Sequence, residues 1–154
     1  NILMGSSAPH ERVVAAAEAA SIADVIDALP QGYRTIVGAG GTRLSGGEAQ
    51  RLAIARALAT EARAYLFDDS FSALDYKTDA ALRQDLHTRL SDKTVVIVAQ
   101  RISTILHADK IVVLDEGRIV GQGTHEELMQ TCEEYREIAM SQLSAEELNG
   151  GDAA

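Results

Sequence analysis

The spacing of short apolar runs constrains the fold of this 154-residue chain more than any other feature. Three such runs stand far apart in the sequence, at 65–67, 94–99 and 111–114. Short continuous apolar runs that alternate with helical stretches are typical of buried parallel strands in an α/β sheet. The sequence therefore predicts an α/β fold with a mostly parallel sheet and flanking helices.

Helices are expected before, between and after these runs. Ser7 can cap a helix with Pro9 in its first turn, and Ser21 can open a second helix that Pro30 stops. Residues 31–43 hold four glycines and are predicted to be loop. Later helices are expected at about 77–90, 103–107 and from Thr124 to about 148. A hairpin turn is expected at 115–118, and 150–154 should be frayed.

Composition excludes several classes of protein. The net charge of −9 makes a nucleic-acid backbone an unsuitable main partner. The one cysteine, Cys132, cannot form an internal disulfide. No stretch approaches the roughly 20 apolar residues of a membrane span, and no secretory signal opens the sequence. Because the chain begins at Asn1 rather than at a Met, we expect it to be part of a longer protein.

A helix with an unusual start is expected after the glycine-rich loop, at Leu44-Ser45-Gly46-Gly47-Glu48. Ser45 and Glu48 have the spacing of a capping box. Each glycine in a helix costs roughly 1 kcal/mol relative to alanine, but the pair leaves a helix N-terminus that an anion or another backbone can approach. The five residues alone leave open the alternative of a flexible turn that precedes an ordinary helix.

Polar residues follow two of the apolar runs. Asp68 and Asp69 end the first run, and Gln100 follows the second. Ligands of parallel α/β sheets bind outside the carboxyl ends of the strands. The sequence therefore predicts a ligand site at these three residues.

Four motifs, in this order, resemble those of the ATP-binding cassette (ABC) ATPases. Residues 44–48 are similar to the family's signature loop, 65–69 to its Walker B strand, and Ser72-Ala73-Leu74-Asp75 to its D-loop, while Gln100 stands where the family has its switch histidine. The resemblance covers nearly the whole chain. It implies an incomplete ABC-type P-loop NTPase domain, with part of a helical subdomain at 1–45 and the C-terminal part of the ATPase core at 46–154.

The resemblance also implies ATP and Mg²⁺ as cofactors. Asp68 would hold Mg²⁺, through water. Asp69 stands where hydrolytic members carry a glutamate that polarises the attacking water, and it is one methylene shorter. Gln100 can hydrogen-bond a γ-phosphate but cannot carry a proton. Either substitution alone could be harmless, whereas both together suggest impaired hydrolysis.

The signature motif is intact except for Glu48, where the family more often has glutamine. In this family two domains pack head to tail, and each ATP lies between one domain's phosphate loop and the other's signature. The resemblance therefore implies that Ser45, Gly46 and Gly47 act on ATP held by a partner, with Asp75 near the same interface. The sequence holds no G-x-x-x-x-G-K-[ST] phosphate loop, so the chain alone should be inactive and bind ATP weakly or not at all.

The chain combines substitutions in its own ATP site, at Asp69 and Gln100, with an intact signature motif that would act on a partner's ATP. This combination resembles the degenerate half of an asymmetric exporter. The expected partners are a non-identical second nucleotide-binding domain and the transmembrane domain, at the cytoplasmic face of the cell membrane. Residues 35–41 look like the exporter-type loop, with Ile36 and Ala39 where glutamates are usual. Two alternatives stay open: a soluble ABC ATPase of the DNA-repair or chromosome-organising kind, and a non-catalytic interaction fragment.

Overall fold

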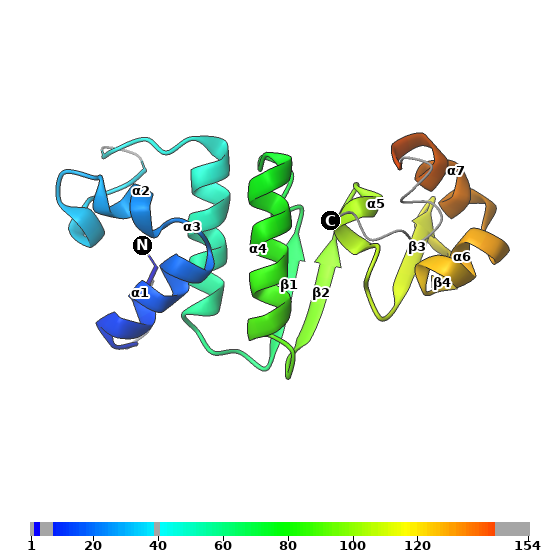
Figure 1. Cartoon of the computed structure of the whole chain (residues 1–154), viewed down its shortest axis with the longest axis horizontal. Helices are drawn as coiled ribbons and strands as arrows, with labels where there is room; N and C mark the ends of the chain where they lie inside the picture. Colours follow the sequence, from blue (N-terminus) through cyan, green and yellow to red (C-terminus); the bar gives the residue numbers. More distant parts are fainter. Residues whose placement is uncertain (1, 4–7, 39–40, 144–154) are drawn as a thin grey trace. The chain divides into compact units, whose positions relative to one another are not determined.

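The computed structural model describes residues 2–3, 8–38 and 41–143 (Figure 1). The chain divides into two compact units, Asn1–Val98 and Ala99–Ala154, and each contains a hydrophobic core. Three expectations lie outside the described residues: the cap at Ser7, the loop residues 39–40, and the C-terminal stretch from residue 144 onward.

The first unit begins with α1 (His10–Ala19), α2 (Ala23–Asp27) and a short 3₁₀ helix, η1 (Gly32–Arg34). The sequence suggested that Ser21 opens α2, but Ser21 does not cap this helix, whose N-cap is Ile22. Ser21 has a φ of 52°, its N–H donates to the carbonyl of Glu18, and the Ile22 N–H donates to the carbonyl of Ala17. This is a Schellman motif, so Ser21 ends α1 instead of opening α2. Pro9 is likewise the N-cap of α1 and not part of its first turn.

The unit continues with α3 (Gly46–Leu58), β1 (Ala64–Asp68), α4 (Tyr76–Arg89) and β2 (Thr94–Val98). Strands β1 and β2 pair in parallel, from Ala64 opposite Thr94 to Asp68 opposite Val98. The predicted parallel pairing is therefore confirmed for these two runs. Tyr65 and Phe67 point from β1 into the core, where they join apolar residues of α1 to α4.

The opposite face of this sheet is exposed. Leu66 is 69% exposed, and Val96 and Val98 are 50% and 52% exposed. The expectation of buried strands is therefore met on one face of β1 and not on the other in the described residues. The reason is that the core of this unit lies on the face of Tyr65 and Phe67, and side chains alternate between faces along a strand.

The second unit contains α5 (Ile102–Ile105), β3 (Ile111–Asp115), β4 (Arg118–Gly123), α6 (His125–Thr131) and α7 (Glu133–Gln142). The hairpin is confirmed, because β3 and β4 pair antiparallel. The expectation that the run at 111–114 joins the parallel sheet is wrong for the described residues, where this strand pairs with β4 alone. Glu116 and Gly117 have φ values of 44° and 77°, which is the two-residue turn that joins adjacent antiparallel strands.

Helices α6 and α7 cover this hairpin. The start of α6 is the predicted capping box, with Thr124 accepting from the N–H of Glu127 and Glu127 accepting from the N–H of Thr124. In the core, His125 Nδ1 lies 2.9 Å from the hydroxyl of Tyr135, and burial raises the pKa of Tyr135 to about 12. Within the described ranges, every helix is too short or too polar to cross a membrane.

Candidate functional site: the start of α3 and the loop after β1

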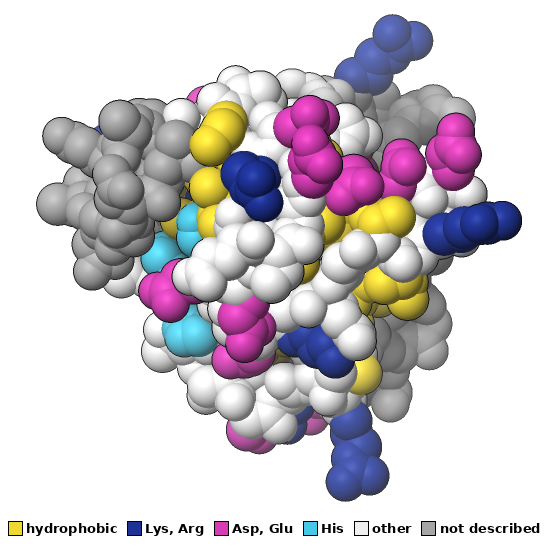
Figure 2. Space-filling view, turned by 90° about the vertical axis from the view of Figure 1, so that its right-hand side faces the viewer, with side chains coloured by type: hydrophobic (Ala, Val, Ile, Leu, Met, Phe, Trp, Pro, Cys, Tyr) yellow, Lys and Arg dark blue, Asp and Glu magenta, His cyan; other side chains and the backbone are white. Residues whose placement is uncertain are grey.

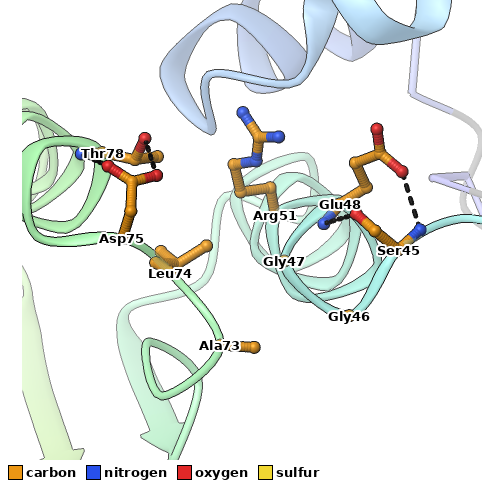
Figure 3. Close-up of a pocket in the computed structure, with 9 residues that line it drawn as sticks. All are labelled: Ser45, Gly46, Gly47, Glu48, Arg51, Ala73, Leu74, Asp75 and Thr78. Atoms are coloured by element: carbon orange, nitrogen blue, oxygen red, sulfur yellow. Dashed lines mark hydrogen bonds between the residues drawn. The ribbon is translucent and has the colours of Figure 1, made fainter.

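The start of α3 is the capping box predicted at 44–48 (Figure 3). The Ser45 hydroxyl oxygen accepts from the N–H of Glu48 at 3.3 Å, and Glu48 Oε2 accepts from the N–H of Ser45 at 2.7 Å. This backbone hydrogen bond is the main reason why the pKa of Glu48 lies below its ordinary value. Glu48 is therefore ionised at neutral pH and belongs to the helix cap.

The same turn keeps hydrogen-bond donors for a ligand. The Ser45 hydroxyl uses only its oxygen in the cap, so its proton can still be donated. The N–H groups of Gly46 and Gly47, as the first two residues of α3, have no acceptor within the helix. Together with the positive end of the helix dipole, these groups can bind an oxyanion.

An open hollow of about 400 Å³ lies in front of this turn (Figure 3). Its walls come from the first two turns of α3, from the residues that precede α4, and from the first turn of α4. They consist of Ser45, Gly46, Gly47, Glu48, Arg51, Ala73, Leu74, Asp75 and Thr78. The structure thus brings four of the five predicted signature residues and three of the four predicted D-loop residues together around one hollow, whereas Leu44 and Ser72 do not line it.

The two glycines of this turn have different surroundings. A Cβ on Gly46 would meet the Cβ of Ala73 at 3.6 Å, which is an ordinary contact. A Cβ on Gly47 would lie 3.0 Å from the carbonyl oxygen of Ala73, closer than side chains normally approach backbone. A side chain at Gly47 would therefore require α3 and the loop to move apart by a few tenths of an ångström, whereas Gly46 can take a side chain without a clash at its Cβ.

Asp69 follows β1 in a strained conformation. Its φ of 48° is uncommon for a residue with a side chain, and such strain costs about 1–3 kcal/mol. Its N–H donates to the carbonyl of Val98 at 3.0 Å, which ties it to the end of β2. Its own carbonyl accepts from the hydroxyl of Ser72 at 3.0 Å and from Nε2 of Gln50 at 3.2 Å. The backbone of the predicted catalytic carboxylate is thus fixed on both sides.

The rest of this loop is held by apolar anchors and by a helix cap. Phe71 and Leu74 are buried in the first core, while Asp69, Ser72 and Ala73 are exposed. Asp75 caps α4, because its carboxylate accepts from the hydroxyl of Thr78 at 2.6 Å and from its N–H at 3.0 Å. These two hydrogen bonds, the hydroxyl first, lower the pKa of Asp75.

Gln100 is positioned by contacts within the second unit. Its carbonyl accepts from Nε2 of Gln142 at 3.0 Å, and Oε1 of Gln142 accepts from the N–H of Ile102 at 2.9 Å. The last residue of α7 therefore fixes the backbone on which Gln100 stands. The side chain of Gln100 is exposed.

The residues at the end of β1 suit Mg²⁺ only as partial ligands. In the described part of the chain, no group of three or more His, Cys, Asp or Glu side chains could hold a metal ion. Asp68, an exposed carboxylate at the end of β1, fits the way Mg²⁺ is held beside a nucleotide, by one or two carboxylates together with waters and phosphate oxygens.

Arg51, which could have paired with a carboxylate, donates to the carbonyl of Ser21 at 2.6 Å.

Sequence reasoning missed the two glutamines that fix these loops, Gln50 and Gln142. For Gln50 a local signal was present, because it lies four residues after Gly46 and thus on the same helix face. Its partners are 19 to 23 residues further along the chain, and only the folded structure brings them within reach. For Gln142, whose partners lie 40 and 42 residues away, no sequence signal was available.

Comparison with known proteins identifies the family. The family model described as "ABC transporter" matches residues 4–72. The leukotoxin export ATP-binding protein LtxB of Aggregatibacter actinomycetemcomitans is 46% identical over 122 residues, which are 79% of this chain and 17% of that protein. The ABC multidrug transporter MDR2 of Trichophyton rubrum is 44% identical over 145 residues, which are 92% of this chain and 11% of that protein. This chain is a segment of an ABC transporter ATP-binding domain.

A solved structure and a further relative agree with this identification. A bacterial Atm1-family ABC exporter with ATP bound matches with a TM-score of 0.86 and 43% identity, over 93% of this chain and 25% of that chain. The alpha-hemolysin translocation ATP-binding protein HlyB of Proteus vulgaris is 44% identical over 125 residues, which are 81% of this chain and 18% of that protein. The chain thus has the ABC nucleotide-binding-domain fold, is homologous to exporter domains, and spans between 11% and 18% of the length of these three curated relatives.

Proposed function

We propose that this ABC domain segment belongs to an ATP-driven membrane exporter and donates its signature turn, residues 44–48, to ATP bound by a partner domain. The observation that carries the proposal is the first turn of α3. Its donors and its dipole face an open hollow shared with residues 73–75. The names of the similar proteins, which include leukotoxin export and multidrug transport, support the exporter assignment.

The chemistry of the turn fits the transition state of phosphoryl transfer. The N–H groups of Gly46 and Gly47 and the hydroxyl of Ser45 would stabilise negative charge on the transferred phosphoryl group. Glu48 keeps the turn in place through its bond to the Ser45 N–H. Its negative charge also opposes an incoming anion, which the uncharged glutamine more common in the family would not do.

The site formed by this chain's own carboxylates is proposed to hydrolyse ATP poorly. Asp69 would polarise the attacking water, but its carboxylate is set back by about 1 Å relative to a glutamate, and such a displacement can cost about 10²-fold in rate. Gln100 would contact the γ-phosphate without being able to exchange a proton. Asp68 would hold Mg²⁺ through water, and the bound ion would neutralise charge on the phosphate oxygens.

The same proposal names the partners and the place. The full protein would be an ATPase whose hydrolysis drives transport, with a transmembrane domain and a non-identical second nucleotide-binding domain, at the cytoplasmic face of the membrane. The net charge of −9 does not favour nucleic acid, and acidic, basic and apolar side chains are interspersed on the face in Figure 2. The exporter names among the relatives also disfavour the DNA-repair alternative.

Substitutions in the signature turn of the intact transporter test the proposal. Gly46→Trp should nearly abolish ATPase activity, because it fills the hollow although its Cβ meets no clash within the chain. Ser45→Ala should lower activity about tenfold or more through the lost hydroxyl. Thr124→Ala is the matched control, because Thr124 is the N-cap of the other capping box and has the same structural role at α6.

Both alanine variants should lose about 1 kcal/mol of stability, since each removes a capping oxygen. Only Ser45→Ala should lose ATPase activity in steady-state assays at saturating ATP. Activity within about twofold of wild type for both Ser45→Ala and Gly46→Trp would mean that this turn is not donated to a reacting ATP.

A further inference from the structure

We infer that Gln50 is a positioning residue that fastens the loop 69–75 to the signature helix, so that the donated turn and the loop of Asp69 move as one body. Gln50 lies in the second turn of α3, which begins at Gly46. The functional part of this inference rests on the proposed function, whereas the structural link does not.

The link consists of three hydrogen bonds from one side chain. Nε2 of Gln50 donates to the carbonyl of Asp69 at 3.2 Å and to the hydroxyl oxygen of Ser72 at 3.0 Å. Oε1 of Gln50 accepts from the N–H of Ala73 at 2.9 Å. A carboxamide that uses both its donor end and its acceptor end on one loop fixes the position and the orientation of that loop.

The loop needs such a link because one of its residues is strained. Asp69 has a φ of 48°, and such conformations persist only where surrounding contacts determine them. Phe71 and Leu74 anchor the middle of the loop in the core, but the carbonyl of Asp69 and the N–H of Ala73 lie on exposed residues. Gln50 supplies one polar contact at each of these two points, and at the Asp69 carbonyl it adds to the hydrogen bond from the Ser72 hydroxyl.

The consequence is a connection between two ATP sites. The signature turn would act on the partner's ATP, and Asp69 would face the ATP of its own domain. Gln50 joins α3, which begins with the signature turn, to the loop that carries Asp69. A displacement of the helix is therefore transmitted to the loop, and the reverse, through the hydrogen bonds of Gln50. Gly47 adds to this connection, because its lack of a side chain lets α3 lie close to the loop. A Cβ on Gly47 would lie 3.0 Å from the carbonyl oxygen of Ala73.

Two substitutions separate the two ends of the carboxamide. Gln50→Glu keeps an acceptor for the Ala73 N–H but loses the donor to Asp69 and Ser72, while Gln50→Met has a similar length and loses both. Gln84→Glu and Gln84→Met are matched controls, because Gln84 is an exposed glutamine on the neighbouring helix α4. All four variants are made in the intact transporter.

The first measurement is hydrogen exchange by mass spectrometry on peptides that cover 69–75. Exchange of the Ala73 amide should rise at least tenfold in Gln50→Met and stay near wild type in Gln50→Glu, because only the second variant keeps the acceptor. Neither control should change it. Unchanged exchange in Gln50→Met would overturn the structural link, whatever the ATPase activity of the variants.

The second measurement is ATP hydrolysis by the transporter. Gln50→Met should lower kcat about tenfold or more, with the KM for ATP within twofold of wild type. The kcat of Gln50→Glu should lie between those of wild type and Gln50→Met. A residue that served stability alone would lower the amount of folded protein and leave kcat per folded molecule unchanged. A kcat within twofold of wild type in Gln50→Met, with exchange increased, would overturn the positioning role. If Gly46→Trp stays active while Gln50→Met still raises the exchange of the Ala73 amide, the donated turn is wrong and the structural link made by Gln50 stands.

Discussion

At the scale of single residues, the carboxylates near the site have structural partners as well as the roles proposed for them. Glu48 and Asp75 each cap a helix, and the hydrogen bonds they accept lower the pKa of both. Asp75 therefore orients the start of α4 in addition to any contact across an interface. Asp69 differs, because its backbone and not its carboxylate makes the contacts that hold it in place.

The cap formed by Asp75 leads to a pH-dependent stability. The pKa of Asp75 in the folded chain lies below its ordinary value of 3.8, so its stabilising effect is complete above that value and is lost as the pH falls through the lower one. Asp75→Asn keeps a good capping residue that does not titrate. In thermal unfolding from about pH 6 to below about pH 3, wild type should therefore lose more Tm than Asp75→Asn. Parallel losses in the two proteins would show that the carboxylate is not a cap.

Local spacing was enough to predict some of these residues but not others. Ser45 with Glu48, and Thr124 with Glu127, lie three residues apart, so both capping boxes could be predicted from sequence and both are confirmed. Ser21 is a residue type that is common at N-caps, but it belongs to the end of α1. The N–H groups of Ser21 and Ile22 donate to the carbonyls of Glu18 and Ala17 there. The strained φ of Asp69 depends on tertiary contacts, and no local pattern indicates it.

At the scale of elements, the apolar runs predicted where strands form better than how they pair. The run at 65–67 and the run at 94–99 are parallel neighbours because α4 connects them. The run at 111–114 has the same composition, but a two-residue turn at Glu116 and Gly117 forces it to pair with the strand that follows. Connection length, rather than strand composition, decided the direction of pairing.

The two faces of β1 should differ sharply in their contribution to stability. Phe67 is 3% exposed and its neighbour Leu66 is 69% exposed. Phe67→Ala should cost about 3–5 kcal/mol of unfolding free energy, because it leaves a cavity in the first core. Leu66→Ala should change this free energy by less than about 0.5 kcal/mol. Urea unfolding of the chain measures both, and equal losses would mean that the exposed face is covered.

At the scale of the whole molecule, the structure shows compact units, whereas the sequence predicted subdomains. The first core combines Ile22 with Ile54 and Phe67, so it extends across residue 45, and the units divide after Val98. The division into 1–45 and 46–154 remains a prediction about family subdomains. Recognition of the family succeeded because its motifs are short and local, and it is confirmed by relatives at 44% to 46% identity.

The proposed function implies an asymmetric pair of sites, in which this chain would donate an intact signature and hydrolyse little ATP with its own carboxylate. Asp69→Asn should therefore reduce turnover of the transporter only slightly, whereas loss of the partner's corresponding carboxylate should remove nearly all of it. Asp69→Glu combined with Gln100→His should raise hydrolysis at this chain's own site, because the two changes restore the reach of the base and a protonatable switch.

Single-turnover ATP hydrolysis in a transporter whose partner site is disabled measures that site directly. We expect slow hydrolysis with the wild-type chain, about 10²-fold or more below the intact transporter, and a faster rate with Asp69→Glu and Gln100→His. A wild-type chain that hydrolyses ATP at the normal rate in this background would show that Asp69 suffices as it stands, and would contradict the asymmetry.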